Sequence, residues 1–433
     1  MAIAYTAGRM KALTFDIRRI RWPFCKAAGW LTPRAFWSRL SGLRLREVPT
    51  PTLWTVRGRA GGPDGRWVRL RTILGGVCGT DIAAVFQRTH PASILRVMTR
   101  FPVVLGHENV AVIEEVGEGA TEWRVGQRVI VEPSLSCVVR GIDPPCVPCA
   151  AGRFTLCERF LDPGPGNLPP GMMIGWNSFT GGSWSREFLA HASQLHAVPD
   201  GVSDEEAIVV DPVASAVHAV LRRLPENGEH VLVVGGGIVG IGVAKAIRAL
   251  GSVAKVTALV RHGHQAEWMR AAGADEAIVS PRGDSAAERY DAVASAVGGR
   301  RLASMFGNQA FIGGYDLTYD CIGTGQSLTD AMKFTRARGQ VVLVGTSQIA
   351  VVDTTPLWLT ELSLIGCNGR QMESYGGRRM HTYDVVLDLQ KGGRLSLQGL
   401  LTHTFRLCDY RSAFAALVTR GRSGVIKIAF RPD

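Results

Sequence analysis

The sequence has no long hydrophobic run. None of its 433 residues lies in an uncharged apolar window of roughly 18 residues or more, so we expect no transmembrane segment. The opening residues lack a long apolar core behind a basic head, which argues against a secretory signal and favours a cytoplasmic protein. General disorder is excluded as well, because hydrophobic residues make up 46% of the chain and charged residues only 20%. A chain of this length is expected to form two or three domains.

Acidic residues are scarce in one part of the chain. Asp and Glu total 37 against 49 Lys and Arg, a net charge of +12. Residues 1–50 contain ten basic and two acidic side chains, so they contribute +8 of that charge. Such a patch can attract nucleic acid, acidic lipid or an acidic partner. Because it is confined to one segment, with no aromatic and basic groove elsewhere, we expect no nucleic-acid partner.

The chain changes texture along its length. Residues 66–200 hold short β-type runs separated by Gly and Pro, which predicts a small β-rich domain. The basic, tryptophan-rich stretch 19–43 departs from this texture, and we expect one or two short helices there. From 208 to 367 apolar strands alternate with helices, which predicts a parallel sheet covered on both faces. The tail, 368–433, returns to β texture.

The stretch 19–43 is the segment with the least obvious role. It could form a lid over the substrate or contact a second subunit. It could also touch an acidic membrane surface or an acidic partner, since it combines tryptophans with basic residues. The remaining interpretation is a solvated surface decoration.

A glycine turn carries the clearest chemical signal. Gly235, Gly237 and Gly240 follow the apolar strand VLVV and open a helix. Glycines at this spacing keep the turn tight and let the backbone approach a pyrophosphate, while the helix N-terminus offers free N–H groups. The turn, with Ile238 and Val239 between its glycines, predicts a dinucleotide site.

The acidic residue typical of an NAD site is missing. About 20 residues beyond the last glycine, where Asp or Glu would hold the ribose hydroxyls, the sequence has Arg261 and His262. An arginine there can pair with a 2′-phosphate, so NADP is favoured over NAD. The alternative is that the two residues form only a solvated loop.

The cysteines do not suggest a disulfide framework. There are nine, an odd number, and four of them fall within 137–157. Without a secretion signal, such crowding indicates metal binding before disulfides. Four sulfur ligands with no open position make a structural zinc site. The predicted ligands are Cys137, Cys146, Cys149 and Cys157.

Two further motifs are weak when taken alone. Cys78 begins the run CGTD, and His107 precedes Glu108 in the run GHE. A lone cysteine is usually a small buried hydrophobe, and a lone histidine is usually a satisfied core residue. Beside a cysteine quartet and a glycine turn, however, they complete a recognisable set.

As a set, these motifs resemble the medium-chain dehydrogenase/reductase superfamily in its zinc-containing alcohol dehydrogenase branch, in the style of the polyol, threonine and glucose dehydrogenases. The resemblance implies an α/β fold. A GroES-like β-rich catalytic domain, 10–207, is completed by the C-terminal segment 368–433, and a Rossmann domain with a doubly wound parallel sheet spans 208–367. The motifs that carry the resemblance are CGTD at 78–81, GHE at 106–108, the cysteine quartet, DP at 211–212 and GGGIVG at 235–240, and only 19–43 is unmatched.

The resemblance implies a catalytic zinc site. Cys78 and His107 match two of its ligands, and Asp211 stands where relatives place a Glu or a Cys ligand. Glu108 matches a carboxylate that lies beside the metal and can join it transiently. Asp211 is one methylene shorter than Glu, so we expect it to reach zinc through water.

The resemblance also implies supporting residues. Thr80 matches the hydroxyl that touches the alcohol, and Asp81 matches the acid that orients the zinc-binding histidine. Two departures from the family pattern matter here. Eight residues separate Cys137 from the next cysteine, where two are usual, and Ala83 replaces a histidine that passes the proton to solvent.

The expected function follows from this resemblance. We expect a zinc-dependent enzyme that transfers hydride between a small-molecule alcohol or carbonyl substrate and NAD(P), as a homodimer or homotetramer. One alternative is a zinc-independent reductase of activated double bonds on the same fold. Another is a non-catalytic nucleotide-binding protein.

Overall fold

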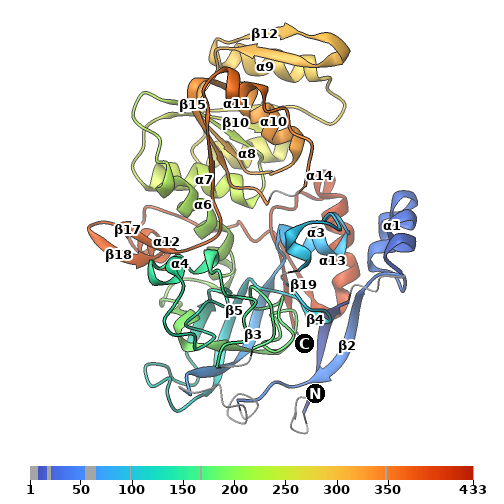
Figure 1. Ribbon diagram of the computed structural model, residues 1–433, viewed down its shortest axis with the longest axis vertical. Coiled ribbons are helices and arrows are strands. Elements are labelled where there is room, and N and C mark those ends of the chain that lie inside the picture. The colour runs from blue at the N-terminus through green and yellow to red at the C-terminus, as the bar shows by residue number, and fades with distance from the viewer. Residues whose placement is uncertain are drawn as a thin grey trace. The chain divides into compact units, whose positions relative to one another are not determined.

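The computed structural model describes residues 8–16, 21–53, 65–97, 99–165, 168–346 and 349–432. These residues form two compact units (Figure 1). The first contains the chain up to Asp211, with Arg370–Met372 and Leu397–Asp433, and the second contains Pro212–Gly369 and Glu373–Ser396. Each unit encloses hydrophobic clusters of its own.

A seven-stranded sheet forms the centre of the first unit. Its strands run in the order β19-β20-β3-β5-β6-β8, and β7 also pairs with β3. The pairs are antiparallel except for β19 with β20. The pairing of β20 with β3 joins the end of the chain to its first half. The bounds are β3 (Trp67–Gly76), β5 (Asn109–Val116), β6 (Arg128–Val131), β7 (Glu187–His191), β8 (Leu195–Ala197), β19 (His403–Arg406) and β20 (Ile428–Arg431).

Short helices connect these strands. None of them exceeds three turns, because Gly and Pro interrupt this half of the sequence frequently. The α-helices are α1 (Arg21–Leu31), α3 (Gly79–Val85), α4 (Val147–Ala150), α5 (Asp204–Ala207), α13 (Tyr410–Val418) and α14 (Arg420–Ser423). The 3₁₀ helices are η1 (Pro33–Trp37), η2 (Ile94–Arg96), η3 (Phe154–Leu156), η4 (Ala192–Gln194) and η6 (Leu407–Asp409).

A smaller sheet holds the N-terminal segment. β1 (Arg9–Phe15) pairs with β2 (Leu43–Pro49) on one side and with β4 (Val103–Val104) on the other, both antiparallel. Phe15 faces Leu43 in the register, so the stretch 16–42 forms one long connection between two neighbouring strands. The connection contains α1 and η1, which confirms the expected short helices.

Two aromatic residues anchor this connection in the core. Phe36 and Trp37, on η1, are buried and meet the ring of Phe86 edge-on at centroid distances of 5.4 and 5.8 Å. Trp37 also stacks on Phe414 of α13 at 6.2 Å. Burying a large aromatic side chain contributes roughly 1.5–3 kcal/mol. The second half of the stretch 19–43, which we call the insert, is therefore part of the hydrophobic core. It does not fit the interpretation of this stretch as a solvated surface decoration.

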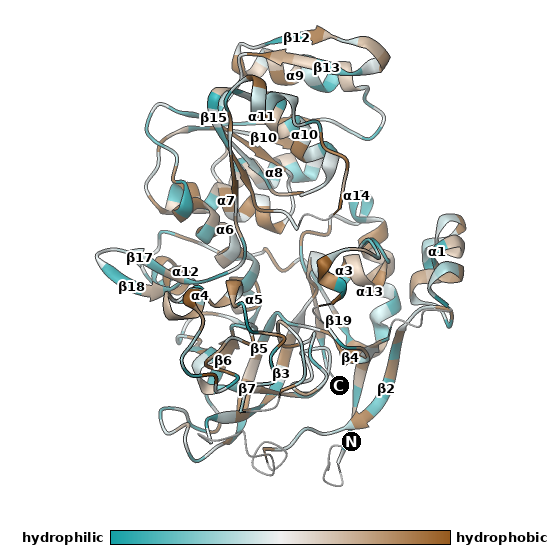
Figure 2. Ribbon diagram, viewed as in Figure 1, coloured by the Kyte–Doolittle hydropathy of each residue, from teal (hydrophilic) through white to brown (hydrophobic). Residues whose placement is uncertain are grey.

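The second unit is built on a six-stranded parallel sheet in the order β11-β10-β9-β14-β15-β16. Its inner strands are apolar because both faces are covered, and β10 is coloured as hydrophobic in Figure 2. This confirms the predicted Rossmann fold. The strands are β9 (His230–Val234), β10 (Lys255–Val260), β11 (Glu276–Val279), β14 (Tyr315–Asp320), β15 (Thr335–Leu343) and β16 (Ser363–Gly366).

Helices and two small hairpins complete the second unit. The α-helices are α6 (Val210–Arg222), which begins at the end of the first unit, α7 (Ile238–Ala249), α8 (Gly263–Ala271), α9 (Ala286–Val297), α10 (Gly325–Phe334), α11 (Thr355–Leu359) and α12 (Thr382–Lys391). One hairpin pairs β12 (Arg300–Ala303) with β13 (Gln309–Ile312) around η5 (Met305–Gly307), and the other pairs β17 (Met372–Tyr375) with β18 (Arg378–His381).

One part of the tail differs from the expected domain plan. The segment 368–433 was expected to complete the β-rich domain, but Glu373–Ser396 belongs to the second unit. Glu373 Oε1 lies 2.7 Å from His218 Nδ1 of α6, and Arg394 donates to the carbonyl of Ala249 at 2.5 Å. These polar contacts tie the segment to helices of the second unit.

Candidate zinc and nucleotide sites

Three metal-binding side chains meet in the first unit. One ligand atom from each of Cys78, His107 and Glu108 lies within 4.8 Å of the others. Cys78 immediately precedes α3, and the other two lead into β5. His107 and Glu108 are only 3% and 1% exposed. A thiol, an imidazole and a carboxylate are donors that zinc accepts, and three protein ligands leave a fourth position for substrate. This donor set fits a catalytic zinc.

Asp81 connects two of these side chains. It is fully buried near the start of α3, and its Oδ2 accepts the N–H of Cys78 at 3.2 Å. Its Oδ1 accepts the indole N–H of Trp176 at 3.2 Å and lies 3.4 Å from Nδ1 of His107. Burial alone would lower the pKa of His107, but the charges of Asp81 and Cys78 outweigh burial and raise this pKa well above its usual value. The same negative surroundings favour a metal cation.

Thr80 places a hydroxyl beside this cluster. It is the second residue of α3, and its Oγ1 lies 3.7 Å from Cys78 Sγ. The next turn of the helix carries Ala83, so its side chain provides no proton-passing group. Among the residues expected around the metal, Thr80 therefore supplies the neutral hydroxyl nearest to the thiol.

The sequence analysis did not predict a role for Lys427. Its ammonium forms a buried ion pair with Glu108 and donates to the carbonyl of Val77 at 3.0 Å. Burial raises the pKa of Glu108, while the charge of Lys427 opposes this rise. Burial would lower the pKa of Lys427, but the charge of Glu108 outweighs it and raises that pKa. A single lysine in the apolar run VIKIAF was the available signal, because a buried lysine needs a partner.

Asp211 lies outside the group of three. Its Oδ1 is 3.1 Å from Nη1 of Arg370, whose Nε is 3.8 Å from Oε1 of the buried Glu132. The expected zinc ligand is thus paired with a guanidinium that the sequence did not predict. Its charge still contributes to the raised pKa of Glu108. Asp211 therefore belongs to the charged surroundings of the cluster, and the structure shows no direct grouping with its three ligand atoms.

The cysteine quartet forms a second cluster. The sulfur atoms of all four cysteines lie within 4.8 Å of one another, despite the unusual spacing after Cys137. Cys137 and Cys157 are 3.7 Å apart at sulfur, and each sulfur accepts a backbone N–H at 3.4 Å. A hydrogen bond from Cys149 lowers the pKa of Cys157 to about 5, although burial opposes the shift. Four sulfur donors at this spacing fit a closed structural zinc site.

A buried arginine supports the loop that carries the quartet. Arg140 is fully buried, and its guanidinium donates to five backbone carbonyls. Burial lowers its pKa to about 10, with the charge of Cys157 acting in the opposite direction. Arg140 lies in the extra stretch between Cys137 and Cys146, so the longer spacing contains its own support. The five acceptors belong to Leu135, Asp162, Leu168, Pro169 and Gly171.

In the second unit, the glycine turn joins β9 to α7. Gly235 has a φ of +108°, which favours glycine. A Cβ on Gly240 would lie 1.8 Å from the carbonyl oxygen of Gly235, so only glycine allows this close packing. Gly237, the N-cap of α7, has open space where a Cβ would be, followed by Ile238 and Val239 in the first turn. The backbone around Gly237 is thus accessible to a ligand, as a pyrophosphate site requires.

Arg261 and His262 lie at the neighbouring strand end. β10 is parallel to β9 with Leu259 beside Val234, so both loops leave the same edge of the sheet. His262 is the N-cap of α8, and the backbone N–H groups of both residues donate to Gln265 Oε1 at 3.2 Å. The strand order reverses between β9 and β14, which is the place where such sheets bind nucleotides.

Together, the nucleotide turn on a parallel sheet and the three-ligand cluster in a β-rich unit define a metal-dependent, dinucleotide-linked oxidoreductase. Comparison with known families agrees with this class. Residues 64–200 match the alcohol dehydrogenase GroES-like domain, and residues 238–390 match the zinc-binding dehydrogenase family.

Individual relatives extend over most of the chain. The chain is 27% identical over 373 residues to L-idonate 5-dehydrogenase of Vitis vinifera, covering 85% of this chain and 88% of that protein. It is 27% identical over 374 residues to sorbitol dehydrogenase of Arabidopsis thaliana, covering 85% and 89%. The structure of an E. coli short chain alcohol dehydrogenase complexed with NADH has the same fold, with a TM-score of 0.69, 21% identity and coverage of 98% and 100%.

The chain therefore belongs to the zinc-containing alcohol dehydrogenase branch of the medium-chain dehydrogenase/reductase superfamily. It is an NAD(P)-linked dehydrogenase that acts on a small-molecule substrate, as expected. The comparisons give no support to a double-bond reductase or a non-catalytic protein. In the part of the chain that the structure describes, each helix is too short or too polar to cross a bilayer.

Proposed function

We propose that this enzyme oxidises a polyhydroxylated alcohol, or reduces the matching ketone, at a zinc held by Cys78, His107 and Glu108. The grouping of these three ligand atoms within 4.8 Å carries the proposal. Cys78, His107 and Glu108 would hold this zinc, which would lower the pKa of a substrate hydroxyl, and a nicotinamide cofactor would supply the hydride chemistry.

Each neighbouring residue then has a defined task. Thr80 offers its hydroxyl to the substrate oxygen and takes part in moving its proton. Asp81 holds His107 and the backbone of Cys78 in place through its two oxygens. Lys427 forms a buried ion pair with Glu108 and offsets part of the negative charge of the ligand set. Because Ala83 has no titratable group, the proton leaves through water or the cofactor's ribose hydroxyls.

A polyhydroxylated substrate is favoured by the charged groups beside the cluster. Arg370 provides donors and Asp211 an acceptor, and the charge of Asp211 acts on Glu108. Such a pair can recognise a hydroxyl next to the one that reacts. The relatives that are L-idonate and sorbitol dehydrogenases have polyhydroxylated substrates in their names. Turnover of sorbitol or L-idonate, against no turnover of a simple secondary alcohol such as 2-butanol, is the expected result, and the reverse preference would contradict it.

The assignment of the third ligand can be tested directly. Glu108→Gln should remove the catalytic zinc, whereas Asp211→Asn should retain it and raise KM for the substrate. Zinc per chain, measured by elemental mass spectrometry, separates the two residues. Loss of zinc in Asp211→Asn with full zinc in Glu108→Gln would show that Asp211 is the ligand instead.

We further propose that the cofactor is NADP. The support is the position of Arg261 and His262 at the end of β10, beside the glycine turn, without an acidic residue there. Arg261→Asp should weaken NADPH binding and spare NADH, while Arg282→Asp, an exposed change of the same charge, should leave both unchanged. Equal dissociation constants for NADPH and NADH in the wild type would remove the reason for choosing NADP.

We also propose a cytoplasmic homodimer or homotetramer. All nine cysteines are free thiols, which suits a reducing compartment. The oligomer is the common state implied by the family resemblance. Light scattering of the purified protein tests this, and a mass equal to one chain would contradict it.

A further inference from the structure

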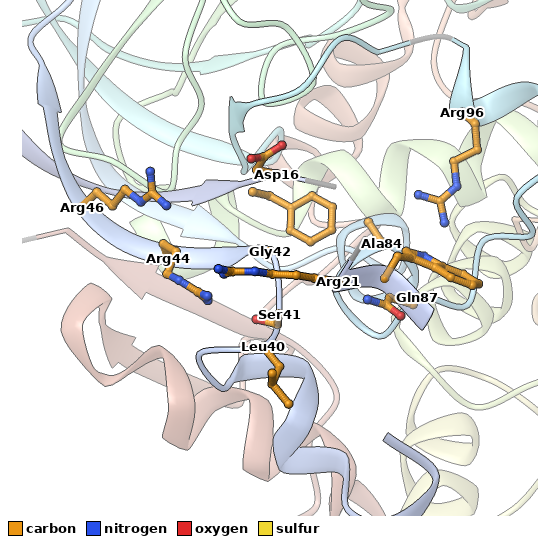
Figure 3. A pocket seen from close by; sticks show the side chains of 12 residues that line it. Asp16, Arg21, Leu40, Ser41, Gly42, Arg44, Arg46, Ala84, Gln87 and Arg96 are labelled. Atoms are coloured by element: carbon orange, nitrogen blue, oxygen red, sulfur yellow. The ribbon is translucent and has the colours of Figure 1, made fainter. Parts of the chain in front are cut away.

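A cavity in the first unit takes no part in the chemistry described so far. It encloses about 100 Å³ between the insert, the ends of β1 and β2, α3 and η2 (Figure 3). Twelve described residues line it, and four of them are arginines while only Asp16 is acidic. The arginines are Arg21, Arg44, Arg46 and Arg96.

Two buried polar atoms of the lining lack hydrogen-bond partners. Arg96 donates through Nη2 to the carbonyl of Thr89 at 2.8 Å, but its buried Nε has no partner. The buried Oε1 of Gln87 also has none. Figure 3 shows Arg96 and Gln87 on one side of the cavity and Arg21 and Arg44 on the other. An unpaired buried polar group costs about 1–3 kcal/mol, so a ligand that pairs with both atoms would gain binding energy.

Positive charge accumulates around this side of the cavity. Lys26 of α1 donates through Nζ to the backbone carbonyl of Gln87 at 2.8 Å. Burial lowers the pKa of Lys26, and the charges of Arg88 and Arg96 lower it further. The surroundings therefore contain several cations and, in the lining, the single acidic residue Asp16, so an added anion would reduce the repulsion among the cations.

We propose that this arginine-lined cavity binds a phosphate-type oxyanion. Arginine forks match the geometry of phosphate oxygens, and hydrogen bonds to a charged oxygen are about twice as strong as neutral ones. An oxyanion accepts from Arg96 Nε, and a protonated oxygen of the same group donates to Gln87 Oε1. The volume suits one such group together with a small part of the molecule that carries it.

The insert is what creates this site. Arg21, Trp22 and the stretch 40–42 all come from the long connection between β1 and β2. The opposite wall includes Ala84 of α3, four residues after Thr80, which corresponds to about 6 Å along the helix axis. An occupied cavity therefore contacts the helix that positions the metal ligand Cys78, although the anion lies outside the metal centre.

The oxyanion could belong to a soluble phosphate compound or to a lipid headgroup. The second source is compatible with α1, whose Phe24, Trp30 and Leu31 are 66%, 85% and 90% exposed. Both sources present the same chemistry to Arg21 and Arg96, so the binding experiment has one arm for each.

The soluble arm uses inorganic phosphate as the probe. It is titrated calorimetrically into the full-length protein at constant ionic strength, with saturating NADPH to occupy the glycine turn. Arg21→Gln and Arg96→Gln should each weaken saturable phosphate binding by about tenfold or more, since each removes a charge-assisted hydrogen bond. Arg34→Gln, which removes the same charge from an exposed position of η1 outside the cavity, should leave phosphate binding unchanged.

The lipid arm uses sedimentation with vesicles of phosphatidylcholine, with or without phosphatidic acid. Binding that requires phosphatidic acid and is lost in Arg21→Gln identifies a lipid headgroup as the source, and phosphate binding without sedimentation identifies a soluble one. Arg96→Lys serves as the control for misfolding, because it retains the positive charge of Arg96 but lacks its Nε–H donor. Absence of binding in both arms, or equal weakening by Arg34→Gln, would overturn the proposal.

Discussion

The two clusters that we propose as zinc sites are assembled from the chain in different ways. The cysteine quartet comes from one loop, 137–157, and its four sulfurs lie within 4.8 Å of one another, which suits a closed zinc site. The second cluster joins the start of α3 to the start of β5. Its counter-charge comes from Lys427, whose ammonium pairs with Glu108 and also donates to the carbonyl of Val77, 350 residues away in the sequence. One candidate site is local and offers four ligands, whereas the other is assembled from distant segments and offers three, which would leave a fourth position on a zinc for substrate.

Their electrostatic surroundings differ as well. The quartet is stabilised by backbone N–H groups and by Arg140, which acts on the loop carbonyls. Ionisable side chains, among them Asp81 and Lys427, surround the cluster of Cys78, His107 and Glu108. A structural metal needs a stable geometry, whereas a catalytic metal needs nearby charges that can respond to substrate. On the proposed assignment, the neighbouring charges as well as the ligand set distinguish the structural site from the catalytic one.

The largest expected effect comes from opening the catalytic cluster. Cys78→Ala should reduce zinc from two ions per chain to one and lower turnover by about a thousandfold or more, because several kcal/mol of charge stabilisation is lost. NADPH affinity should stay nearly unchanged. Elemental analysis and steady-state kinetics measure this, with the buried Cys25→Ala as the matched control. Full activity in Cys78→Ala would show that the zinc mechanism is wrong.

The converse change should spare the chemistry and damage stability. Cys149→Ser should also leave one zinc, but at the catalytic site. Because structural zinc contributes directly to folding, the melting temperature should fall by about 10 °C or more. Turnover of the folded fraction should remain close to that of the wild type. Scanning calorimetry with zinc analysis tests this, and an unchanged melting temperature would mean that the loop is stable without metal.

Removing only one partner of the ion pair between Lys427 and Glu108 should lower the free energy of unfolding. In the zinc-free protein, Lys427→Met leaves Glu108 buried without a counter-charge, so the free energy of unfolding of the first unit should fall by about 3–5 kcal/mol. The double variant Glu108→Gln/Lys427→Met should recover most of this loss, since both charges are gone. Denaturant titration measures both variants, and simple additivity of the two losses would contradict the pairing.

A smaller effect is expected at the loop of the quartet. Arg140→Lys retains the charge but loses the planar fork that reaches five carbonyls, so stability should fall by about 1–3 kcal/mol. Arg159→Lys, just beyond this loop and with a partly exposed ion pair to Asp162, should change stability little. Denaturant titration compares the two, and equal losses would show that Arg140 has no special role.

Much of the fold and part of the candidate site could be predicted because their signals are local. The alternation of strands and helices after residue 208 and the spacing of Gly235, Gly237 and Gly240 both follow from short-range geometry. Cys78 and His107, by contrast, were interpretable only through a family resemblance. Their spacing of nearly 30 residues does not by itself show that they meet.

Other features could not be predicted for a physical reason. Lys427 lies beside Glu108 because the adjoining strand β20 pairs with β3, and Arg370 meets Asp211 only in the folded first unit. Pairings across such separations depend on the whole sheet, so the expectation that Asp211 would act as a ligand did not take its guanidinium partner into account. The arginine cavity likewise draws its lining from five separate elements.

The sequence by itself determined the division into a β-rich and an α/β unit, the nucleotide-binding turn and the cysteine quartet. These features depend on backbone periodicity and on close spacing, which act within a few residues. Only the tertiary structure decided which charges are neighbours. Burial makes each unpaired charge expensive, so the final partners of Glu108, Asp211 and the insert's arginines depend on what the folded chain brings within a few ångströms of them.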